Sequence, residues 1–401
     1  MAERALQDLM DDLVSPGQVV AGKYRIDRVL GKGGMGVVVQ AWHLHFDEPV
    51  AIKLLLPEMG ANPEAVARFE REAKAAFKIK SEHVARVIDV GRIDEGPGIP
   101  FLVMEYLDGI DVADLLGDGV AQPIFDCVDY ILQTCEAVAE AHAHGIVHRD
   151  LKPENLFLVR RADGTACIKV LDFGLSKVAS DTDKRERALT TQAQVMGTPQ
   201  YMSPEQWMSA RDVGPASDIW ALGVLLYELL TGRQPFNKDQ IAQLCTMVLN
   251  AEAQPIAELR PEVPPGLVAV VEKCLRKKPE ERYPSVAHLA LALYAFGPRS
   301  SKASAKRIAG VLQGAGVSTD AIPPSIVPPA GDEHPFEGTF LMTDLQHQQA
   351  AAGLEAALQK ANAEANWVSS PGLGSSPGLG GSPSLGGSPS LGGSPGGYQA
   401  H

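Results

Sequence analysis

The first part of the chain alternates apolar and polar positions in patterns that predict β-strands. In YRIDRVL (24–30), Tyr24 and Ile26 alternate with polar side chains. VVVQAW (37–42) is rich in β-branched and aromatic residues, and EPVAIKLLL (48–56) is a nearly continuous apolar run. We therefore expect three strands in succession before the first long helix.

The pattern then changes to a helical period. NPEAVARFEREAKAAFKI (62–79) begins with Asn62 as a helix cap, and its apolar residues recur at helical spacing. CVDYILQTCEAVAEAHA (127–143) is also helical, and Gly145 ends it. Strands followed by helices, instead of strict alternation, indicate an α+β fold with two lobes.

Composition divides the chain into three parts. Residues 1–22 form a short acidic leader that is compatible with one amphipathic helix, and residues 23–297 carry the regular apolar patterns. Residues 298–401 are rich in Pro, Gly and Ser, which predicts a largely disordered tail. Within this tail, a stretch near 343–367 is rich in Ala, Leu and Gln and predicts a helix.

The overall composition excludes several classes of protein. The formal net charge of -13 argues against a general role in binding nucleic acid. The five cysteines are scattered and form no C-x-x-C motif, which argues against a disulfide framework or a zinc site and favours a cytoplasmic location. The chain has no run near the roughly 18 apolar residues that a membrane span needs, so we expect none.

A dense group of glycines raises the question of a phosphate site. LGKGGMG (30–36) fits the pattern G-x-G-x-x-G, which also opens dinucleotide-binding domains. In those domains a helix follows the glycines and holds the pyrophosphate. Here a predicted strand follows, which excludes a dehydrogenase. The glycines join two strands, as a flap over phosphate or as an ordinary hairpin turn.

Lys53 lies in the otherwise apolar run 48–56. A buried ammonium group without a partner is costly, so Lys53 requires an anion. Phosphate oxygens and a carboxylate would supply one. Glu72, on the predicted helix, is the candidate carboxylate, and Glu70 on the same helix competes with it.

The strongest motif is HRDLKPEN (148–155), which matches the pattern H-R-D-L-x-x-x-N. In this spacing Asp150 can orient the proton of an attacking hydroxyl, while Asn155 can hold a metal ion without competing for that proton. Lys152 adds a positive charge near the transferred phosphoryl group. Asp172, in the D-F-G that follows an apolar strand, is well placed to bind Mg²⁺.

The order of these motifs resembles that of eukaryotic-type (Hanks-type) protein serine/threonine kinases. GKGGMGVV and GTPQYMSPEQ are similar to the bacterial branch of the family. The resemblance covers about residues 24–296 and not the leader or the tail. It implies a bilobal kinase fold, with a small strand-rich N-lobe at about 23–105 and a larger helical C-lobe at about 106–297.

The resemblance also implies binding of ATP with Mg²⁺, Mn²⁺ being a possible alternative. Lys53 would pair with the phosphates and with Glu72, and Asn155 and Asp172 would be metal ligands; Asp150 and Lys152 complete the implied catalytic set. Met104 would close the back of the adenine site, which the backbones of its neighbours would bind. The implied nucleotide contacts are Leu30, Gly31, Lys32, Gly33, Gly34, Met35, Gly36, Val38, Ala51, Lys53, Met104, Glu105, Leu107 and Phe157.

The resemblance assigns supporting roles in the second lobe. Thr198 would brace the catalytic aspartate, and Asp218 would tether the catalytic loop. Glu205 would form a buried ion pair with Arg282. Ser203 replaces the alanine usual at its position.

The implied activity is transfer of the γ-phosphate of ATP to Ser or Thr hydroxyls of proteins, itself included, in bacterial signalling. Thr190 and Thr191 are the candidate autophosphorylation sites, and Arg149 beside Asp150 could receive a phosphate. The tail is a candidate for docking a partner. The rival hypothesis is a pseudokinase scaffold, against which the intact motif residues argue.

Overall fold

The computed structural model describes residues 14–33, 36–60, 62–93, 98–173, 198–209 and 213–317. The predictions for Gly34, Met35, Thr190, Thr191 and the tail helix near 343–367 lie outside these ranges.

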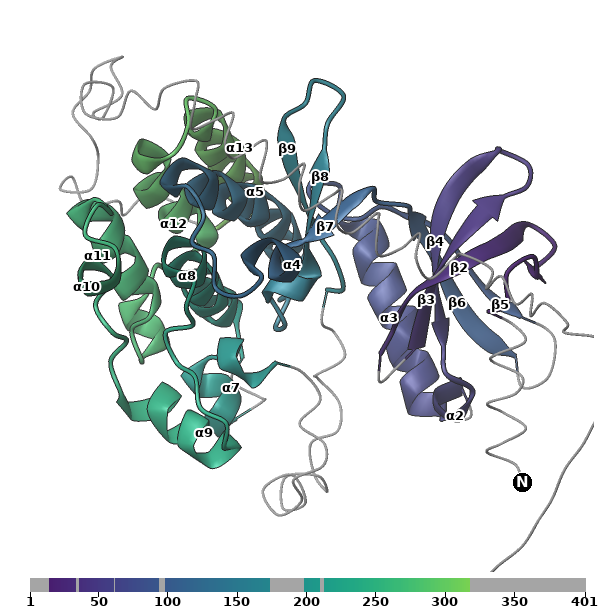
Figure 1. The fold of residues 1–401 in the computed structure, drawn as a ribbon, viewed down its shortest axis with the longest axis horizontal. Coiled ribbons are helices and arrows are strands. Elements are labelled where there is room, and N and C mark those ends of the chain that lie inside the picture. Colours follow the sequence, from purple (N-terminus) through teal and green to yellow (C-terminus); the bar gives the residue numbers. More distant parts are fainter. Residues whose placement is uncertain are drawn as a thin grey trace, which may run out of the picture. The chain divides into compact units, whose positions relative to one another are not determined.

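Within the described residues, the N-terminal part is built on a six-stranded antiparallel sheet (Figure 1). The three predicted strands are confirmed as β2, β3 and β4, and the spatial order is β1-β2-β3-β4-β6-β5. The strands are β1 (Val19–Val20), β2 (Tyr24–Lys32), β3 (Gly36–His43), β4 (Glu48–Leu55), β5 (Val87–Ile93) and β6 (Ile99–Glu105).

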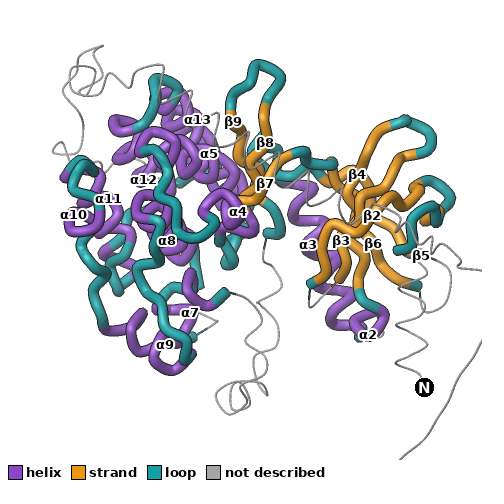
Figure 2. Tube along the Cα trace, in the orientation of Figure 1, coloured by secondary structure: helices purple, strands orange, loops and turns teal. Residues whose placement is uncertain are grey.

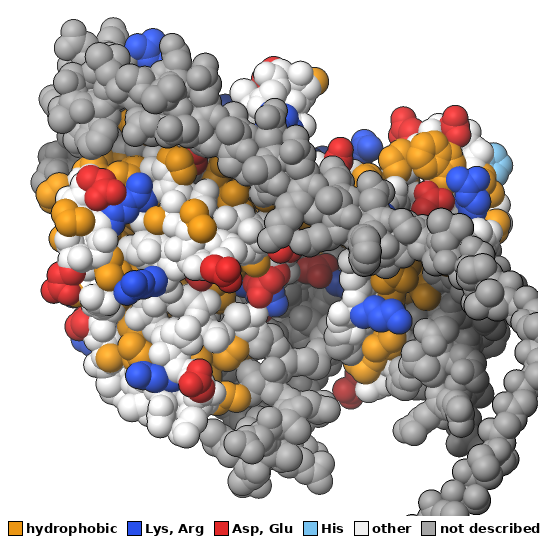
Figure 3. Space-filling model, in the orientation of Figure 1, with side chains coloured by type: hydrophobic (Ala, Val, Ile, Leu, Met, Phe, Trp, Pro, Cys, Tyr) orange, Lys and Arg blue, Asp and Glu red, His pale blue; other side chains and the backbone are white. Residues whose placement is uncertain are grey.

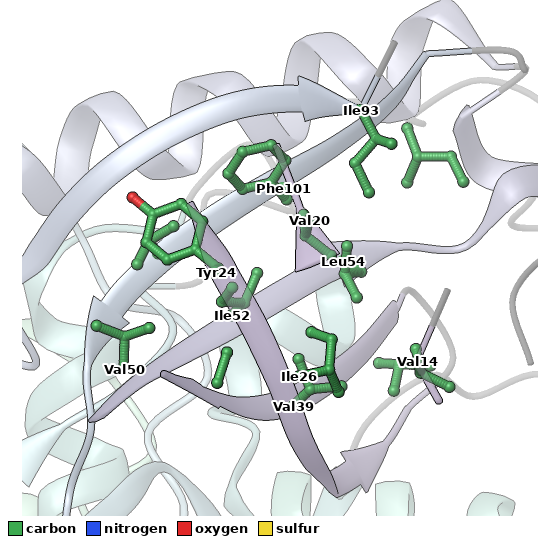
Figure 4. Packing of buried hydrophobic residues seen from close by; sticks show 14 residues of the cluster. Val14, Val20, Tyr24, Ile26, Val39, Val50, Ile52, Leu54, Ile93 and Phe101 are labelled. Carbon is green, nitrogen blue, oxygen red and sulfur yellow. The ribbon is translucent and has the colours of Figure 1, made fainter. Parts of the chain in front are cut away.

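Alternate residues of the strands build a core on one face of the sheet. Ile52, Leu54 and Phe101 are buried in one cluster (Figure 4). Tyr24 joins this cluster, and its hydroxyl donates a hydrogen bond to Asp89 on β5 at 3.0 Å. Burial and this neighbouring carboxylate raise the pKa of Tyr24 to about 12. The hydrogen bond therefore links the start of β2 to the edge strand β5.

The opposite face of the sheet is covered by helix α3 (Pro63–Lys78), which follows the short α2 (Pro57–Gly60). The side chain of Asn62 caps α3 by accepting from the backbone N–H of Glu64 at 2.9 Å, as predicted. Phe69 packs with Leu102, a residue that faces away from the first cluster. The helical spacing of apolar residues in this segment therefore corresponds to its buried side.

The C-terminal part is helical (Figure 2). The apolar helix α8 is almost entirely buried, and Trp220 within it stacks on Phe236 with ring centroids 5.5 Å apart. The longer helices pack on one another around it. The helices are α4 (Val112–Leu116), α5 (Ile124–Ala143), α7 (Pro204–Met208), α8 (Pro215–Thr231), α9 (Ile241–Asn250), α10 (Ile256–Leu259), α11 (Pro265–Cys274), α12 (Val286–Leu293) and α13 (Ser301–Gly314).

A second small sheet contains β7 (Gly109–Asp111), β8 (Leu156–Arg160) and β9 (Ala166–Val170). The Asp163-Gly164 pair predicts a type I′ turn between β8 and β9, which requires a positive φ at both residues. Only Gly164 has one, at 83°. The turn type is wrong because the Asp163 side chain instead accepts from the Thr165 backbone N–H at 2.9 Å, which stabilises a wider loop.

Both ends of the folded region extend beyond the predicted limits of 23 and 297. Val14 is buried in the first sheet cluster, and β1 pairs with β2 inside the segment assigned to the leader. At the other end, α13 packs on α5 and α12, inside the segment assigned to the tail. Its buried stripe includes Ser301 and Ser304, small polar residues that a hydrophobic pattern does not count.

None of the helices within the described ranges combines the length and hydrophobicity required to cross a membrane.

Candidate active site

The glycine-rich segment joins β2 to β3. Lys32 lies opposite Val37 in the ladder, and the Gly33 N–H donates to the Gly36 carbonyl at 2.9 Å. A Cβ atom on Gly36 would overlap the carbonyl oxygen of Leu54, so this glycine is required for close strand packing. A Cβ on Gly31 would meet open space. The segment is thus fixed at Gly36 and leaves room beside Gly31 for a ligand.

Lys53 lies in β4 between Val38 and Leu102 of the neighbouring strands. Its Nζ atom is 2.7 Å from Oδ1 of Asp172, and only 17% of the Lys53 side chain is exposed. Asp172 has a positive φ of 48°. This left-handed backbone turns the residue just after the apolar strand β9, and the contact brings two of the predicted site residues together.

Helix α3 carries the two carboxylates considered as partners of Lys53. Glu70 accepts a hydrogen bond from Arg92 at 2.8 Å, so this competitor is engaged on β5. The side chain of Glu72 lies outside the described residues, and its pairing with Lys53 stays a prediction.

The residues expected to enclose adenine come from four strands, β2, β3, β4 and β8. Ala51 is buried and lies opposite Met104, and Val38 lies opposite Lys53. Phe157 on β8 lies opposite Lys169. Leu30 is 40% exposed on β2.

Met104 borders a small cavity of about 30 Å³ that Lys53, Asp172 and Phe173 also line. Beyond it, the carboxylate of Glu105 accepts from Lys169 at 2.8 Å, which ties β6 to β9. Leu107 follows in the connection to β7 and is partly buried.

The catalytic-loop residues converge on Asp150. Nζ of Lys152 is 3.1 Å from Oδ2 of Asp150. Nδ2 of Asn155 donates to the Asp150 backbone carbonyl at 2.7 Å and lies 3.3 Å from Oδ2. With its nitrogen turned to Asp150, Asn155 directs its Oδ1 oxygen elsewhere. Oxygen atoms are the ligands that Mg²⁺ prefers, so the donor set of Asn155 and Asp172 fits this ion.

Asp218, at the start of α8, anchors this loop. It accepts backbone N–H bonds from His148 at 2.9 Å and from Arg149 at 2.8 Å, which confirms the predicted tether. Arg149 itself has a strained, positive φ of 65°. Burial would raise the pKa of the Asp218 carboxyl, but the hydrogen bonds with His142 and with the backbone N–H of Arg149 hold it below its usual value.

His148 connects the catalytic loop to the D-F-G segment. Its Nε2–H donates to the Leu171 carbonyl at 3.0 Å, and its Nδ1 lies 3.3 Å from the Asp150 N–H. The ring packs against Phe173, with centroids 4.7 Å apart. Burial lowers the pKa of His148, so the neutral ring is favoured. The arrangement positions Asp150 and Asp172 from one buried side chain.

Thr198 does not brace Asp150 as predicted. Its hydroxyl donates to Glu154 at 3.2 Å, while the Asp150 carboxylate is contacted by Lys152. The expectation is wrong in this structure because a neighbouring carboxylate, rather than Asp150, is the acceptor within reach of Thr198.

Sequence reasoning missed the role of Ser203, noted only as a replacement. Ser203 caps α7 reciprocally with Gln206, whose Oε1 accepts from the Ser203 N–H at 2.9 Å. The Nε2 of Gln206 donates to the Arg149 carbonyl at 2.9 Å, which fastens α7 to the catalytic loop. The S-x-x-Q spacing is the signal that could have identified this cap.

The predicted buried pair of Glu205 and Arg282 is confirmed. Two guanidinium nitrogens donate to the two carboxylate oxygens at 2.7 and 2.8 Å. Burial would raise the pKa of Glu205, but the hydrogen bonds from Arg282 hold it below its usual value. The hydroxyl of Ser217 also donates to Glu205, at 2.7 Å. This network joins α7 to α8 behind the site.

Comparison with known proteins gives matches over the part of the chain that contains these residues. A protein-family model described as a protein kinase domain matches residues 24–292. The chain is 40% identical over 290 residues to the serine/threonine-protein kinase Pkn1 of Myxococcus xanthus, covering 72% of this chain and 40% of that protein. It is 35% identical over 274 residues to the serine/threonine-protein kinase PknB of Mycolicibacterium smegmatis, covering 68% and 42%.

Among solved structures, the Mycobacterium tuberculosis PknI kinase domain is similar, with a TM-score of 0.54 and 25% identity over 73% of this chain and 98% of that one. The match to the curated relatives spans less than half of their length.

Proposed function

We propose a function for this chain on the basis that it belongs to the protein kinase family. It transfers the γ-phosphate of ATP to Ser or Thr hydroxyls of proteins. The observation that carries the proposal is the joint placement of Asp150, Lys152 and Asn155 in one loop with the Lys53–Asp172 contact. A scaffold without catalysis would not require this set of charges. The setting we propose is bacterial signalling in the cytoplasm.

The reaction would depend on positioning and charge neutralisation. The Asp150 carboxylate would accept or orient the proton of the acceptor hydroxyl, held in place by the backbone bonds to Asp218. Lys152 would offset negative charge developing on the transferred group. Lys53 would pair with the α- and β-phosphates, in exchange for part of its present contact with Asp172.

The metal proposed for this reaction is Mg²⁺, with Mn²⁺ as an alternative. Asn155 and Asp172 would hold it, and the bound ion would neutralise charge on the ATP phosphates. Asp172 suits this role because 49% of its side chain is exposed, so a ligand can reach it.

The nucleotide would lie between the glycine segment and β8. Gly31, Gly33, Gly34 and Gly36 would cover the phosphates, and Lys32 and Met35 belong to the same segment. Leu30, Val38, Ala51 and Phe157 would enclose adenine, and the backbones of Glu105 and Leu107 would bind its edge, in front of Met104. Glu72 would orient Lys53.

The acceptors we propose are Ser and Thr of other proteins and of this chain, at Thr190 or Thr191. The basis for Ser and Thr over Tyr is Lys152 in the motif DLKPEN. Arg149 is partly buried beside the site and would receive the added phosphate. The tail beyond the described residues is proposed to dock a partner.

A labelled-phosphate assay tests the proposed function against the pseudokinase alternative. Purified chain is incubated with Mg²⁺, ATP labelled in the γ position and a generic protein acceptor, followed by phosphoamino-acid analysis. We expect label on Ser or Thr with the wild type and not with Asp172→Ala. Equal labelling by both proteins, or by neither, would support a scaffold instead.

A further inference from the structure

A charged cluster lies away from the proposed catalytic site, where helix α13 meets α5. Figure 1 draws α13 beside α5, and the two helices pack on each other. Two guanidinium nitrogens of Arg307 on α13 donate to the two carboxylate oxygens of Glu136 on α5, at 2.7 and 2.8 Å. The family model matches the chain only as far as residue 292, so α13 lies beyond the matched part. Arg307 therefore brings a charge from outside the matched domain to α5.

The other neighbour of Glu136 is a buried histidine in the connection between α3 and β5. The side chain of His83 is 1% exposed, and its Nε2 atom lies 4.0 Å from Oε1 of Glu136 and 3.4 Å from Oε1 of Glu82. On the face seen in Figure 3, acidic and basic side chains lie next to each other at the surface, where water screens them. His83 differs because water hardly reaches its ring, so nearby charges act on it more strongly.

The hydrogen bond of His83 determines which ring nitrogen carries the proton. Nδ1 lies 2.9 Å from the backbone carbonyl oxygen of Ile168, which can only accept, so Nδ1 must donate. In the neutral ring Nε2 therefore has no proton, and this acceptor lies nearest to the oxygens of two carboxylates. A second proton would make Nε2 a donor that suits both. Burial opposes the added charge and lowers the pKa of His83.

The charge on His83 depends on the groups around its ring. The carboxylates favour the imidazolium form, and Arg161 opposes it. Burial raises the pKa of Cys167 and keeps that thiol neutral. Arg307 acts through Glu136, because a carboxylate paired with a guanidinium attracts a proton on His83 less strongly. The titratable and charged groups that face the ring are Glu82 in the same connection, Asp129 and Glu136 on α5, Arg161 just after β8, and Cys167 on β9.

His83 also holds the strand that leads to the D-F-G segment. The Val170 N–H donates to the backbone carbonyl of His83 at 2.8 Å, and the ring of His83 donates to Ile168 on the same strand. Val170 is the last residue of β9 and precedes Asp172 by two positions. A movement of the His83 connection toward α5 would therefore carry the end of β9 with it and displace Asp172.

We propose that His83 is a positioning residue for phosphate transfer and that Arg307 of α13 sets its charge. While Arg307 holds Glu136, His83 stays neutral and Asp172 keeps its place beside Lys53. Without Arg307, Nε2 takes up a proton from water, moves toward Glu136 and draws β9 along, so transfer slows. The effect on rate rests on the proposed function, whereas the coupling of charges does not.

Titration of the His83 ring in the full chain tests the coupling. The ring signal, from isotope-labelled histidine, is assigned by its loss in His83→Gln. Arg307→Gln removes the positive charge beside Glu136, and Lys306→Gln removes an equal charge from an exposed position on the same helix. The midpoint of the His83 titration should rise by at least about 0.5 pH unit in Arg307→Gln and stay unchanged in Lys306→Gln. Equal midpoints in these two variants would overturn the coupling.

The amide signal of Val170 tests the link to β9 without requiring activity. It should titrate with the same midpoint as the His83 ring, both in the wild type and in Arg307→Gln, and this step should vanish in His83→Gln. A Val170 signal that does not follow the ring would overturn the positioning role. Both titrations can be read from a chain that transfers no phosphate, so failure of the proposed function is recognised separately.

Kinetics test the effect on transfer. In the wild type, kcat for labelling a protein acceptor should fall as the pH drops through the His83 midpoint, while KM for the acceptor stays the same. This step should lie at a higher pH in Arg307→Gln, by the shift that the ring shows, and be absent in His83→Gln. A step that does not move in Arg307→Gln would contradict the proposal. Thermal unfolding of each variant over the same pH range shows whether the chain stays folded.

Discussion

The ammonium group of Lys53 lies 2.7 Å from the carboxylate of Asp172, although the two residues are 119 positions apart in the chain. One comes from the middle of the apolar strand β4, and the other lies two residues after the end of β9. The pair is partly solvated on the Asp172 side, where 49% of the side chain is exposed. Its contribution to stability should accordingly be small, and the role we propose for it is in catalysis.

The first prediction is that loss of Lys53 affects catalysis far more than stability. Lys53→Met should lower the rate of phosphate transfer by at least about 100-fold, the order expected for removal of one preorganised charge at a reacting centre. Its melting temperature should change little, because Asp172 is about half exposed to solvent, and ion pairs that water screens contribute about 1 kcal/mol or less. Kinetics and thermal unfolding of the same preparation check both. If Lys53→Met instead lost much of its stability, and its activity fell only in proportion to the fraction of folded protein, the catalytic role of Lys53 would be contradicted.

Gly36 and Gly33 provide a matched pair for the glycine segment. Gly36→Ala should weaken both stability and ATP binding, because its Cβ would overlap the Leu54 carbonyl and push β3 away from β4. Gly33→Ala meets no atom closer than 3.9 Å and should leave stability nearly unchanged. Denaturant unfolding and nucleotide titration of both variants test this. The account requires the larger loss of stability at position 36.

Helix α13 should stabilise the domain through apolar packing more than through its ion pair. Leu312 is buried, and Leu312→Ala should cost about 2–5 kcal/mol in the free energy of unfolding. Arg307 donates two hydrogen bonds to Glu136, but its side chain is 56% exposed, so Arg307→Ala should cost about 1 kcal/mol or less. Urea unfolding of the two variants measures the difference, and the reverse order would show that the ion pair dominates.

The buried His148 predicts a pH dependence of stability. Burial lowers its pKa in the folded state, although Asp218, Asp150 and Asp172 nearby favour the charged ring. The unfolded chain therefore takes up a proton first, below about pH 6.5. Stability is complete above that pH and falls as the pH drops toward the lowered value.

His148→Phe keeps the ring packing against Phe173 but cannot titrate. The free energy of unfolding of this variant should change less steeply between pH 7 and 5, even if its overall stability is lower. His83 and His288, whose pKa values burial also lowers, would contribute to the remaining slope. An identical slope in wild type and variant would show that His148 does not contribute.

The sequence was sufficient where chemistry requires fixed residues at fixed spacing. The motifs indicated one site that contains Lys53, Asp150, Asn155 and Asp172. In the structure, Asn155 contacts Asp150 and Lys53 contacts Asp172. The Asp218 tether and the Glu205–Arg282 pair were likewise expected, from the resemblance to the kinase family and not from any local pattern.

The sequence was insufficient where burial depends on small or polar residues. The stripe of α13 contains buried serines, so its helix has a weak hydrophobic pattern. β1 is two residues long and carries no periodicity at all. The catalytic loop carries two carboxylates, Asp150 and Glu154, and the sequence does not show which of them Thr198 contacts. In the structure it contacts Glu154. These differences concern local partners and boundaries, whereas the catalytic motifs are fixed by the reaction.

The most direct test of the central claim is the transfer of label from ATP to protein by the wild type and by Asp150→Asn, which keeps the size of the side chain. With Mg²⁺ present, the wild type should place label from the γ position, and none from the α position, on Ser or Thr. Asp150→Asn should retain ATP binding and its melting temperature but lose transfer. Wild-type chain that binds ATP and labels no acceptor, itself included, would contradict the account.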